Sequence, residues 1–214
     1  MPRIRLDLVL ADLIQRMNEA RELVAMASQL PTIPNQHVNP PFRVKHTEQI
    51  ISLAFLSGFL AWEKFVEESF ILYTLGKRSP KGYSPHLFIS PRNREHAIKF
   101  AKGDRRFPLW NDYDFIIDRS RHFFKDGRPY IPTYRLIRNH LLEMKTVRNA
   151  IAHSSNESQE KFKTLVRDKL RHYPRGLSPG GFLVSLIPKT NPPNSFFSSY
   201  FDTLVWAAER IVPN

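Results

Sequence analysis

Apolar residues recur every three or four positions in four long stretches of the sequence, and prolines lie between those stretches. Such spacing gives a helix one apolar face, whereas proline breaks a helix interior. The pattern predicts the core helices of an all-α, up-and-down helical bundle, near residues 4–29, 47–75, 133–153 and 195–212. A further helix is predicted at 158–172, with Asn156 as its N-cap. The run GGFLVSLIP, residues 180–188, is interpreted as a short strand or hairpin.

Residues 77–132 break this pattern, because prolines, glycines and short helical fragments alternate there with many lysines and arginines. A length of 214 residues suits one domain, so we interpret residues 1–214 as a single domain and 77–132 as a basic lobe inserted into it. Four aromatic side chains lie among these cations: Phe88, Phe100, Phe107 and Trp110. They are candidates for stacking on nucleic-acid bases, but packing of the basic lobe is the favoured interpretation.

Positive charge is concentrated in the middle of the chain. The formal net charge is +12, and residues 77–175 hold 23 basic and 10 acidic side chains, whereas the segments before and after them are nearly neutral. Such a distribution favours a polyanionic partner, either nucleic acid or an anionic membrane surface, and charge alone does not distinguish the two. A merely solvated basic lobe is the alternative interpretation.

The absence of cysteine excludes a structural disulfide, a thiol nucleophile and a thiolate zinc site. The apolar run at residues 50–62 is thirteen residues long, short of the roughly 20 that a membrane-spanning helix needs, and therefore predicts a buried helix. Asp7 and Asp12 interrupt the stretch that a signal peptide would require to be apolar. We therefore expect a cytoplasmic protein with no membrane partner.

The sequence VRNAIAHSS, residues 147–155, stands at the end of the third predicted core helix. On a straight helix Arg148 shares the apolar stripe with Met144 and Ile151, and a buried guanidinium group needs an acidic partner. Glu63, at the edge of the apolar face of the second predicted core helix, is the partner that the sequence predicts.

The polar residues of this segment have two different spacings. Asn149 and His153 are four residues apart, so the asparagine amide is placed to orient the imidazole. Arg148 and His153 are five residues apart, which corresponds to roughly 140° around a helix at ~100° per residue. One straight helix is therefore expected not to bring Arg148 and His153 together.

The spacing of Arg148, Asn149 and His153 resembles the arginine–polar–histidine signature of the HEPN superfamily. The segment FLSGFLAWEKFVEESFILYTLG, residues 55–76, likewise resembles the aromatic, glutamate-containing helix of the RiboL-PSP group and related HEPN proteins. The resemblance implies a homodimer in which the arginine and histidine of two facing copies build one composite site. It also implies RNA cleavage with no metal and no cofactor, in which a ribose hydroxyl attacks the adjacent phosphate and leaves a cyclic phosphate and a free hydroxyl.

In that reaction His153 is expected to transfer protons, Arg148 to stabilise charge on the phosphoryl oxygens, and Asn149 to position the reacting groups. Glu63 and Ser155 are supporting residues. Some HEPN toxins carry, at the position of Ser155, a tyrosine that a partner nucleotidyltransferase modifies, so this form of regulation is not expected here. The predicted RNA contacts are seven cations: Arg92, Arg94, Lys99, Lys102, Arg105, Arg106 and Lys145.

The sequence thus predicts a homodimeric, metal-independent endoribonuclease, a toxin or anti-phage effector with an antitoxin protein as a further partner. A non-catalytic HEPN-like module that binds RNA or another protein is the alternative. A third reading is a metal-dependent phosphodiesterase that uses Asp112, Asp114 and Asp118, although Asn111 or Asp112 is more simply the N-cap of a helix.

Overall fold

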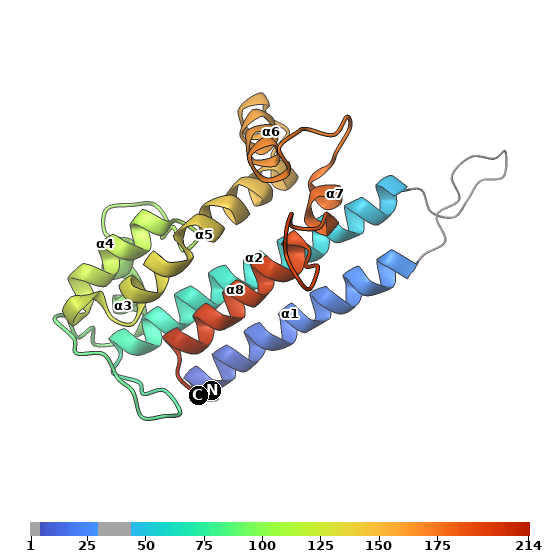
Figure 1. Cartoon of the computed structure of the whole chain (residues 1–214). Coiled ribbons are helices and arrows are strands. Elements are labelled where there is room, and N and C mark those ends of the chain that lie inside the picture. The colour runs from blue at the N-terminus through green and yellow to red at the C-terminus, as the bar shows by residue number, and fades with distance from the viewer. Residues whose placement is uncertain (1–4, 30–43) are drawn as a thin grey trace. The chain divides into compact units, whose positions relative to one another are not determined.

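The structure is a computed structural model that describes residues 5–29 and 44–214. Within these residues it contains α-helices, one 3-10 turn and isolated bridges, but no β-strand, so the predicted all-α fold is confirmed. The α-helices are labelled in Figure 1, and the elements run in the order α1 (Leu6–Gln29), α2 (Val44–Thr74), α3 (Arg94–Lys102), α4 (Tyr113–Phe123), η1 (Lys125–Gly127), α5 (Tyr130–Ala152), α6 (Asn156–Leu170), α7 (Pro179–Val184) and α8 (Phe196–Ile211).

The four predicted core helices correspond to α1, α2, α5 and α8. Two finer predictions are wrong. The N-cap of α6 is Ser155 and not Asn156, because the Ser155 hydroxyl accepts the backbone N–H of Ser158. The predicted strand at residues 180–188 is instead mostly the helix α7, because the Ser178 hydroxyl caps it and Pro179 suits the first helical position.

The chain divides into two compact units, and each is described by itself. Unit 1 comprises residues 1–15, 60–142 and 203–214, and unit 2 comprises residues 16–59 and 143–202. The long helices α1, α2, α5 and α8 therefore each contribute residues to both units. The predicted basic lobe falls entirely within unit 1.

Unit 1 has an aromatic core around Phe70 of α2, which is fully buried. Its ring centroid lies 5.0 Å from that of Phe124, 5.3 Å from that of Tyr130 and 5.5 Å from that of Trp110. Tilted and edge-to-face aromatic pairs each stabilise a core by about 0.5–1.5 kcal/mol beyond the area they bury. The basic lobe is thus packed onto α2 through its rings, and Trp110 packs the lobe as the sequence predicts.

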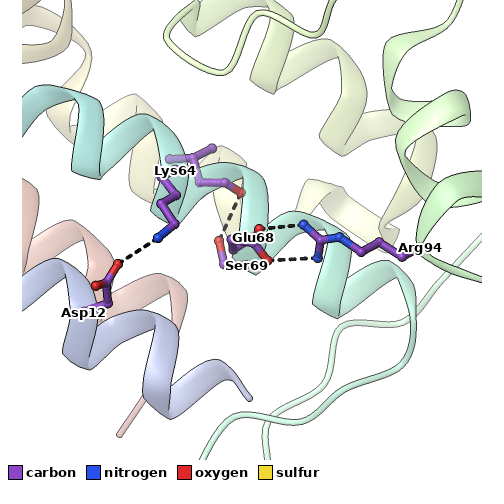
Figure 2. A network of polar contacts seen from close by, with 6 residues as sticks. Asp12, Lys64, Glu68, Ser69 and Arg94 are labelled. Atoms are coloured by element: carbon purple, nitrogen blue, oxygen red, sulfur yellow. Dashed lines mark hydrogen bonds and ion pairs between the residues drawn. The ribbon is translucent and has the colours of Figure 1, made fainter. Parts of the chain in front are cut away.

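Glutamates on α2 bind polar groups of the basic lobe beside this aromatic core. Arg94 of α3 donates from both terminal nitrogens to Glu68, at 2.5 and 2.9 Å, as Figure 2 shows. The Trp110 side chain is hydrogen-bonded to Glu67, whose pKa is nevertheless raised above its usual range by burial and by the neighbouring Glu68 carboxylate. Arg94, one of the predicted RNA contacts, thus has both terminal nitrogens of its guanidinium group bound to a carboxylate, and its RNA contact stays a prediction.

Unit 2 holds the final turns of α5 through Glu143. Its carboxylate accepts a hydrogen bond from the Tyr200 hydroxyl of α8 at 3.1 Å and an ion pair from Lys169 of α6 at 2.5 Å. Burial, followed by the nearby Glu143 charge, raises the pKa of Tyr200, so this hydroxyl remains a donor. The helix end that carries the motif is thus tied to two other helices of the same unit.

Within the described residues, α2 is long and apolar enough to cross a membrane, and half of its apolar window is buried inside the protein. A helix in a protein core meets the same criterion, so this finding is weak evidence for a membrane span.

The ion pair between Glu68 and Arg94 predicts a measurable effect on stability. Glu68→Gln should lower the free energy of unfolding by about 1–2 kcal/mol, because the Glu68 side chain is only 17% exposed and its partner would lose a carboxylate. Thermal or urea unfolding measures this effect. The matched control is Lys64→Gln, which breaks the more exposed pair with Asp12 in Figure 2 and should change stability by less than about 1 kcal/mol. Equal losses in both variants would contradict the proposed attachment.

A second stability prediction concerns Gly180 in α7. A Cβ atom at this position would lie 2.0 Å from the backbone oxygen of Glu48 on α2, so the two helices would have to separate. We expect Gly180→Ala to lower the unfolding free energy by about 3 kcal/mol. Val184→Ala, at an exposed position of the same helix, should cost less than about 1 kcal/mol, and a larger loss there than at Gly180 would refute the close approach.

Candidate functional site

The candidate site is the carboxyl end of α5 in unit 2. The helix ends at Ala152, and His153 follows it as an exposed residue whose backbone N–H still donates to the carbonyl of Asn149 at 2.9 Å. Arg148 and Asn149 lie in the last turns of the helix and are half-buried. The motif therefore places one exposed imidazole directly after a helix end that carries a partly covered guanidinium group.

The structure brings Arg148 and His153 together. Nη1 of Arg148 lies 3.4 Å from Nε2 of His153 and 3.4 Å from Oδ1 of Asn149. The expectation that a straight helix keeps the two apart is wrong, because His153 follows the last helical residue and the long arginine side chain reaches it. Distances of 3.4 Å exceed ordinary hydrogen-bond lengths, so both contacts are weak and hold the guanidinium group only loosely.

Donor and acceptor can be assigned in the contact between the Arg148 guanidinium group and the His153 imidazole. A guanidinium group only donates hydrogen bonds, so this contact requires Nε2 of His153 to accept, with the ring proton on Nδ1. In this tautomer the lone pair of Nε2 faces the cation. The arrangement thus combines a proton acceptor with a positive charge next to it.

The predicted partner of Arg148 is wrong. Glu63 belongs to unit 1, where its Oε1 accepts a hydrogen bond from the Asn111 amide at 3.0 Å, so a side chain of the basic lobe has taken the place expected for the arginine. Arg148 has Asn149 and His153 as its partners instead. No ion pair of Arg148 with a carboxylate occurs among residues 5–29 and 44–214.

One donor of Arg148 has no acceptor. Its Nε atom is buried, and within the described part of the chain it makes no hydrogen bond. A buried donor left unpaired costs about 1–3 kcal/mol, and an anion that accepted this hydrogen would relieve that cost. Because the guanidinium group also has no carboxylate partner, it is suited to bind an oxyanion.

The first turn of α6 supports the segment that carries His153. Gln159 donates from Nε2 to the carbonyl of Ala150 at 3.1 Å and to that of His153 at 3.4 Å. Ser155, predicted as a supporting residue, is the N-cap of α6 and so fixes where that helix begins. The reach of the Gln159 side chain back to α5 has no signature in the local sequence pattern.

A groove of about 650 Å³ lies in unit 2 next to the motif. Ala150 and Ile151, the two residues midway between Arg148 and His153, form one wall of it. The remaining lining residues come from α2 and from the start of α7: Lys45, Glu48, Gln49, Ser52, Leu53, Ser178 and Pro179. Sequence reasoning missed this groove, although the pair Gly180-Gly181 is a signal of close backbone approach that would have pointed to it.

Close contact between α7 and α2 shapes one end of that groove. The Ser178 hydroxyl donates to Oε2 of Glu48 at 2.7 Å, and a Cβ at Gly181 would lie 2.8 Å from Oε1 of the same carboxylate. Both glycines therefore serve packing, and neither belongs to a phosphate loop.

The seven predicted RNA contacts divide between the units. Six of them belong to unit 1, and Lys145 belongs to unit 2, together with the motif. Apart from Arg94, which binds Glu68, the lobe cations are exposed or half-exposed: Arg92, Lys99, Lys102, Arg105 and Arg106. Lys145 on α5 is half-buried and already has an interaction partner.

The carboxylates of α4 have structural roles. Asp112 is the N-cap of α4, because its side chain accepts the backbone N–H of Phe115 at 3.0 Å, and this confirms one of the two predicted caps. Asp118 forms an ion pair with Arg119 at 3.0 Å. In the described ranges no three His, Asp or Glu side chains are grouped as ligands of one metal ion.

The site therefore consists of an arginine without a carboxylate partner and of a histidine and an asparagine that are both in contact with it. Its resemblance to the HEPN superfamily rests on this spacing and on the aromatic helix. Comparison of the chain with models of protein families, with curated proteins and with solved structures finds no match.

Proposed function

We propose that the protein is a metal-independent endoribonuclease of HEPN type that acts as a homodimer, in the role of a toxin or an anti-phage effector. The observation that carries the proposal is the contact of 3.4 Å between Arg148 and His153 at a helix end, with the Nε atom of the arginine left without an acceptor. A base beside an unpaired guanidinium group is the pair of functions that cleavage of a phosphodiester requires.

In the proposed reaction His153 accepts the proton of a ribose 2′-hydroxyl. The 2′-oxygen then forms a bond to the adjacent phosphorus, and the bond from phosphorus to the 5′-oxygen breaks. The departing 5′-oxygen takes up the proton that His153 accepted from the 2′-hydroxyl. The products are a 2′,3′-cyclic phosphate and a 5′-hydroxyl.

Arg148 supplies the stabilisation of charge in this scheme. Negative charge grows on the phosphoryl oxygens as the new bond forms, and the guanidinium group and its free Nε–H are donors for those oxygens. Asn149 accepts from Nη1 of Arg148, so it positions the guanidinium group and takes no part in proton transfer.

The proposal predicts cleavage of single-stranded RNA by the purified protein in the presence of EDTA. His153→Ala should lower the rate about 10²–10⁴-fold and Arg148→Ala about 10²–10³-fold, because they remove the proton acceptor and the charge stabilisation respectively. Analysis of the product ends should find a cyclic phosphate. Matched controls are His172→Ala and Arg175→Ala, two exposed residues of unit 2 outside the motif, which should cleave at the parent rate.

Three results would each exclude part of this proposal. Equal cleavage by the parent and both motif variants would exclude Arg148 and His153 as catalytic residues, and loss of activity in EDTA would indicate a metal-dependent reaction. Intact RNA, bound with an affinity that both substitutions leave unchanged, would favour a non-catalytic RNA-binding module. The exposed cations of the basic lobe are the observation that supports this second candidate, because phosphate contacts by many cations share the binding energy.

The proposed homodimer rests on the resemblance to HEPN proteins. Because Arg148 and His153 are in contact within one chain, we expect each copy to carry its own arginine–histidine pair. An equimolar mixture of Arg148→Ala and His153→Ala proteins should remain as inactive as each variant, since neither chain retains both residues of the pair. Recovery of about a quarter of the parent activity would show instead that the working arginine and histidine come from different copies. Sedimentation of the parent protein tests the dimer itself, and a monomer at assay concentration would contradict it.

A further inference from the structure

Two exposed phenylalanine rings stand among the cations of the basic lobe. Phe100, near the end of α3, is 42% exposed, and Phe107, in the segment between α3 and α4, is 65% exposed. The sequence predicts that these rings pack the lobe. Phe107 is mostly exposed instead, whereas the Phe100 ring lies 4.2 Å from that of His96 and Trp110 is only 8% exposed. A large apolar ring that the fold leaves in water is suited to contact a partner.

The cations that surround these rings are not neutralised by carboxylates. Within the described residues no ion pair is formed by the four cations between positions 99 and 106: Lys99, Lys102, Arg105 and Arg106. Arg106 lies over the ring of Phe107 at 5.3 Å, and Arg105 lies over the buried ring of Phe115 at 5.5 Å. Rings and guanidinium groups therefore alternate on this part of the lobe.

A second guanidinium group lies at the ring of Phe115. Arg119 of α4 is 5.7 Å from this ring, and its Nε atom is buried with no hydrogen-bond acceptor in the part of the chain that the structure describes. The neighbouring Gly103 has a φ of +59°, and a Cβ there would lie 3.2 Å from Nη1 of Arg119, so the loop approaches the guanidinium group closely. Arg105 and Arg119 thus share one ring, and Asp118 pairs with Arg119 but not with Arg105.

We propose that residues 99–107 together with Arg119 form a binding surface for single-stranded RNA, in which bases stack on Phe100 and Phe107 and a phosphate binds between Arg105 and Arg119. The identity of the nucleic acid as RNA rests on the proposed function. The surface itself rests on the exposed rings, the unpaired cations and the free Nε atom of Arg119.

The alternation of rings and cations favours a single strand over a duplex. In a duplex the bases are stacked on each other and present no free face, whereas a single strand offers a base for each ring and a phosphate for each cation. An anionic membrane surface also attracts cations, but it has no planar group to stack on a ring. We therefore infer that the substrate of the proposed nuclease is unpaired RNA.

The test measures binding of a fluorescein-labelled oligouridylate of about 12 nucleotides by anisotropy. The protein carries His153→Ala, so that the RNA stays intact. Adding Phe100→Ala and Phe107→Ala should weaken binding by about 10-fold or more, because stacking contributes about 1–3 kcal/mol per base. Phe107→Tyr should bind like the parent, whereas Phe107→Leu, which keeps an apolar side chain but no ring, should be as weak as Phe107→Ala.

Further arms test the phosphate contact and the specificity. Arg105→Gln should weaken binding and reduce the slope of log affinity against log salt by about 1. The matched control is Phe88→Ala, which removes a ring that is 60% exposed but lies outside residues 99–107, and it should bind like the parent. A duplex of the same sequence length should bind more weakly than the single strand, and anionic phosphatidylserine vesicles should not compete.

Several outcomes would overturn this surface. These are unchanged binding by the doubly substituted protein, an equal loss in Phe88→Ala, tighter binding to the duplex, or displacement by vesicles. Unfolding temperatures check that the variants are folded, and since both rings are exposed they should be nearly unchanged. If the parent cleaves RNA but the ring substitutions do not change RNA binding, only the binding surface is refuted. If binding depends on the rings but the parent does not cleave RNA, only the proposed nuclease activity is refuted.

Discussion

Burial of the aromatic face of α2 is the interaction on which both units depend. In unit 1 the rings of Trp110, Phe124 and Tyr130 pack around Phe70. In unit 2 the ring centroid of Phe55 lies 6.2 Å from that of Phe201 on α8. Ring burial is the largest favourable contribution that single side chains make to such a core. The irregular backbone of the basic lobe is stable because its buried rings, Trp110, Phe124 and Tyr130, belong to this core.

A glutamate on the polar edge of α2 neutralises one cation of the basic lobe and leaves other cations of the lobe exposed. Glu68 binds Arg94 and neutralises the charge of this arginine. Lys99, Arg105 and Arg106 lie elsewhere on the lobe and keep their charge exposed. The same acidic residues that attach the lobe thus also select its binding face, because a carboxylate neutralises only the cation that it contacts.

The motif and the lobe share one electrostatic feature, which is an arginine with a buried Nε atom that finds no acceptor. Arg148 shows it at the end of α5, and Arg119 shows it on α4. Folded proteins rarely leave such donors unpaired, so each guanidinium group is suited to bind an anion. This feature supports the proposed reaction at Arg148 and the proposed binding surface at Arg119, each by itself.

The sequence by itself determined the all-α class, the four long helices, a helix cap at Asn111 or Asp112 and the position of Arg148 and His153 at a helix end, because periodicity and capping are set by residues near in the chain. Only the tertiary structure decided that Glu63 binds Asn111 and that Arg148 meets His153. It also decided which rings of the lobe are buried. Partners and exposure depend on residues far apart in the chain, and no local pattern carries that information.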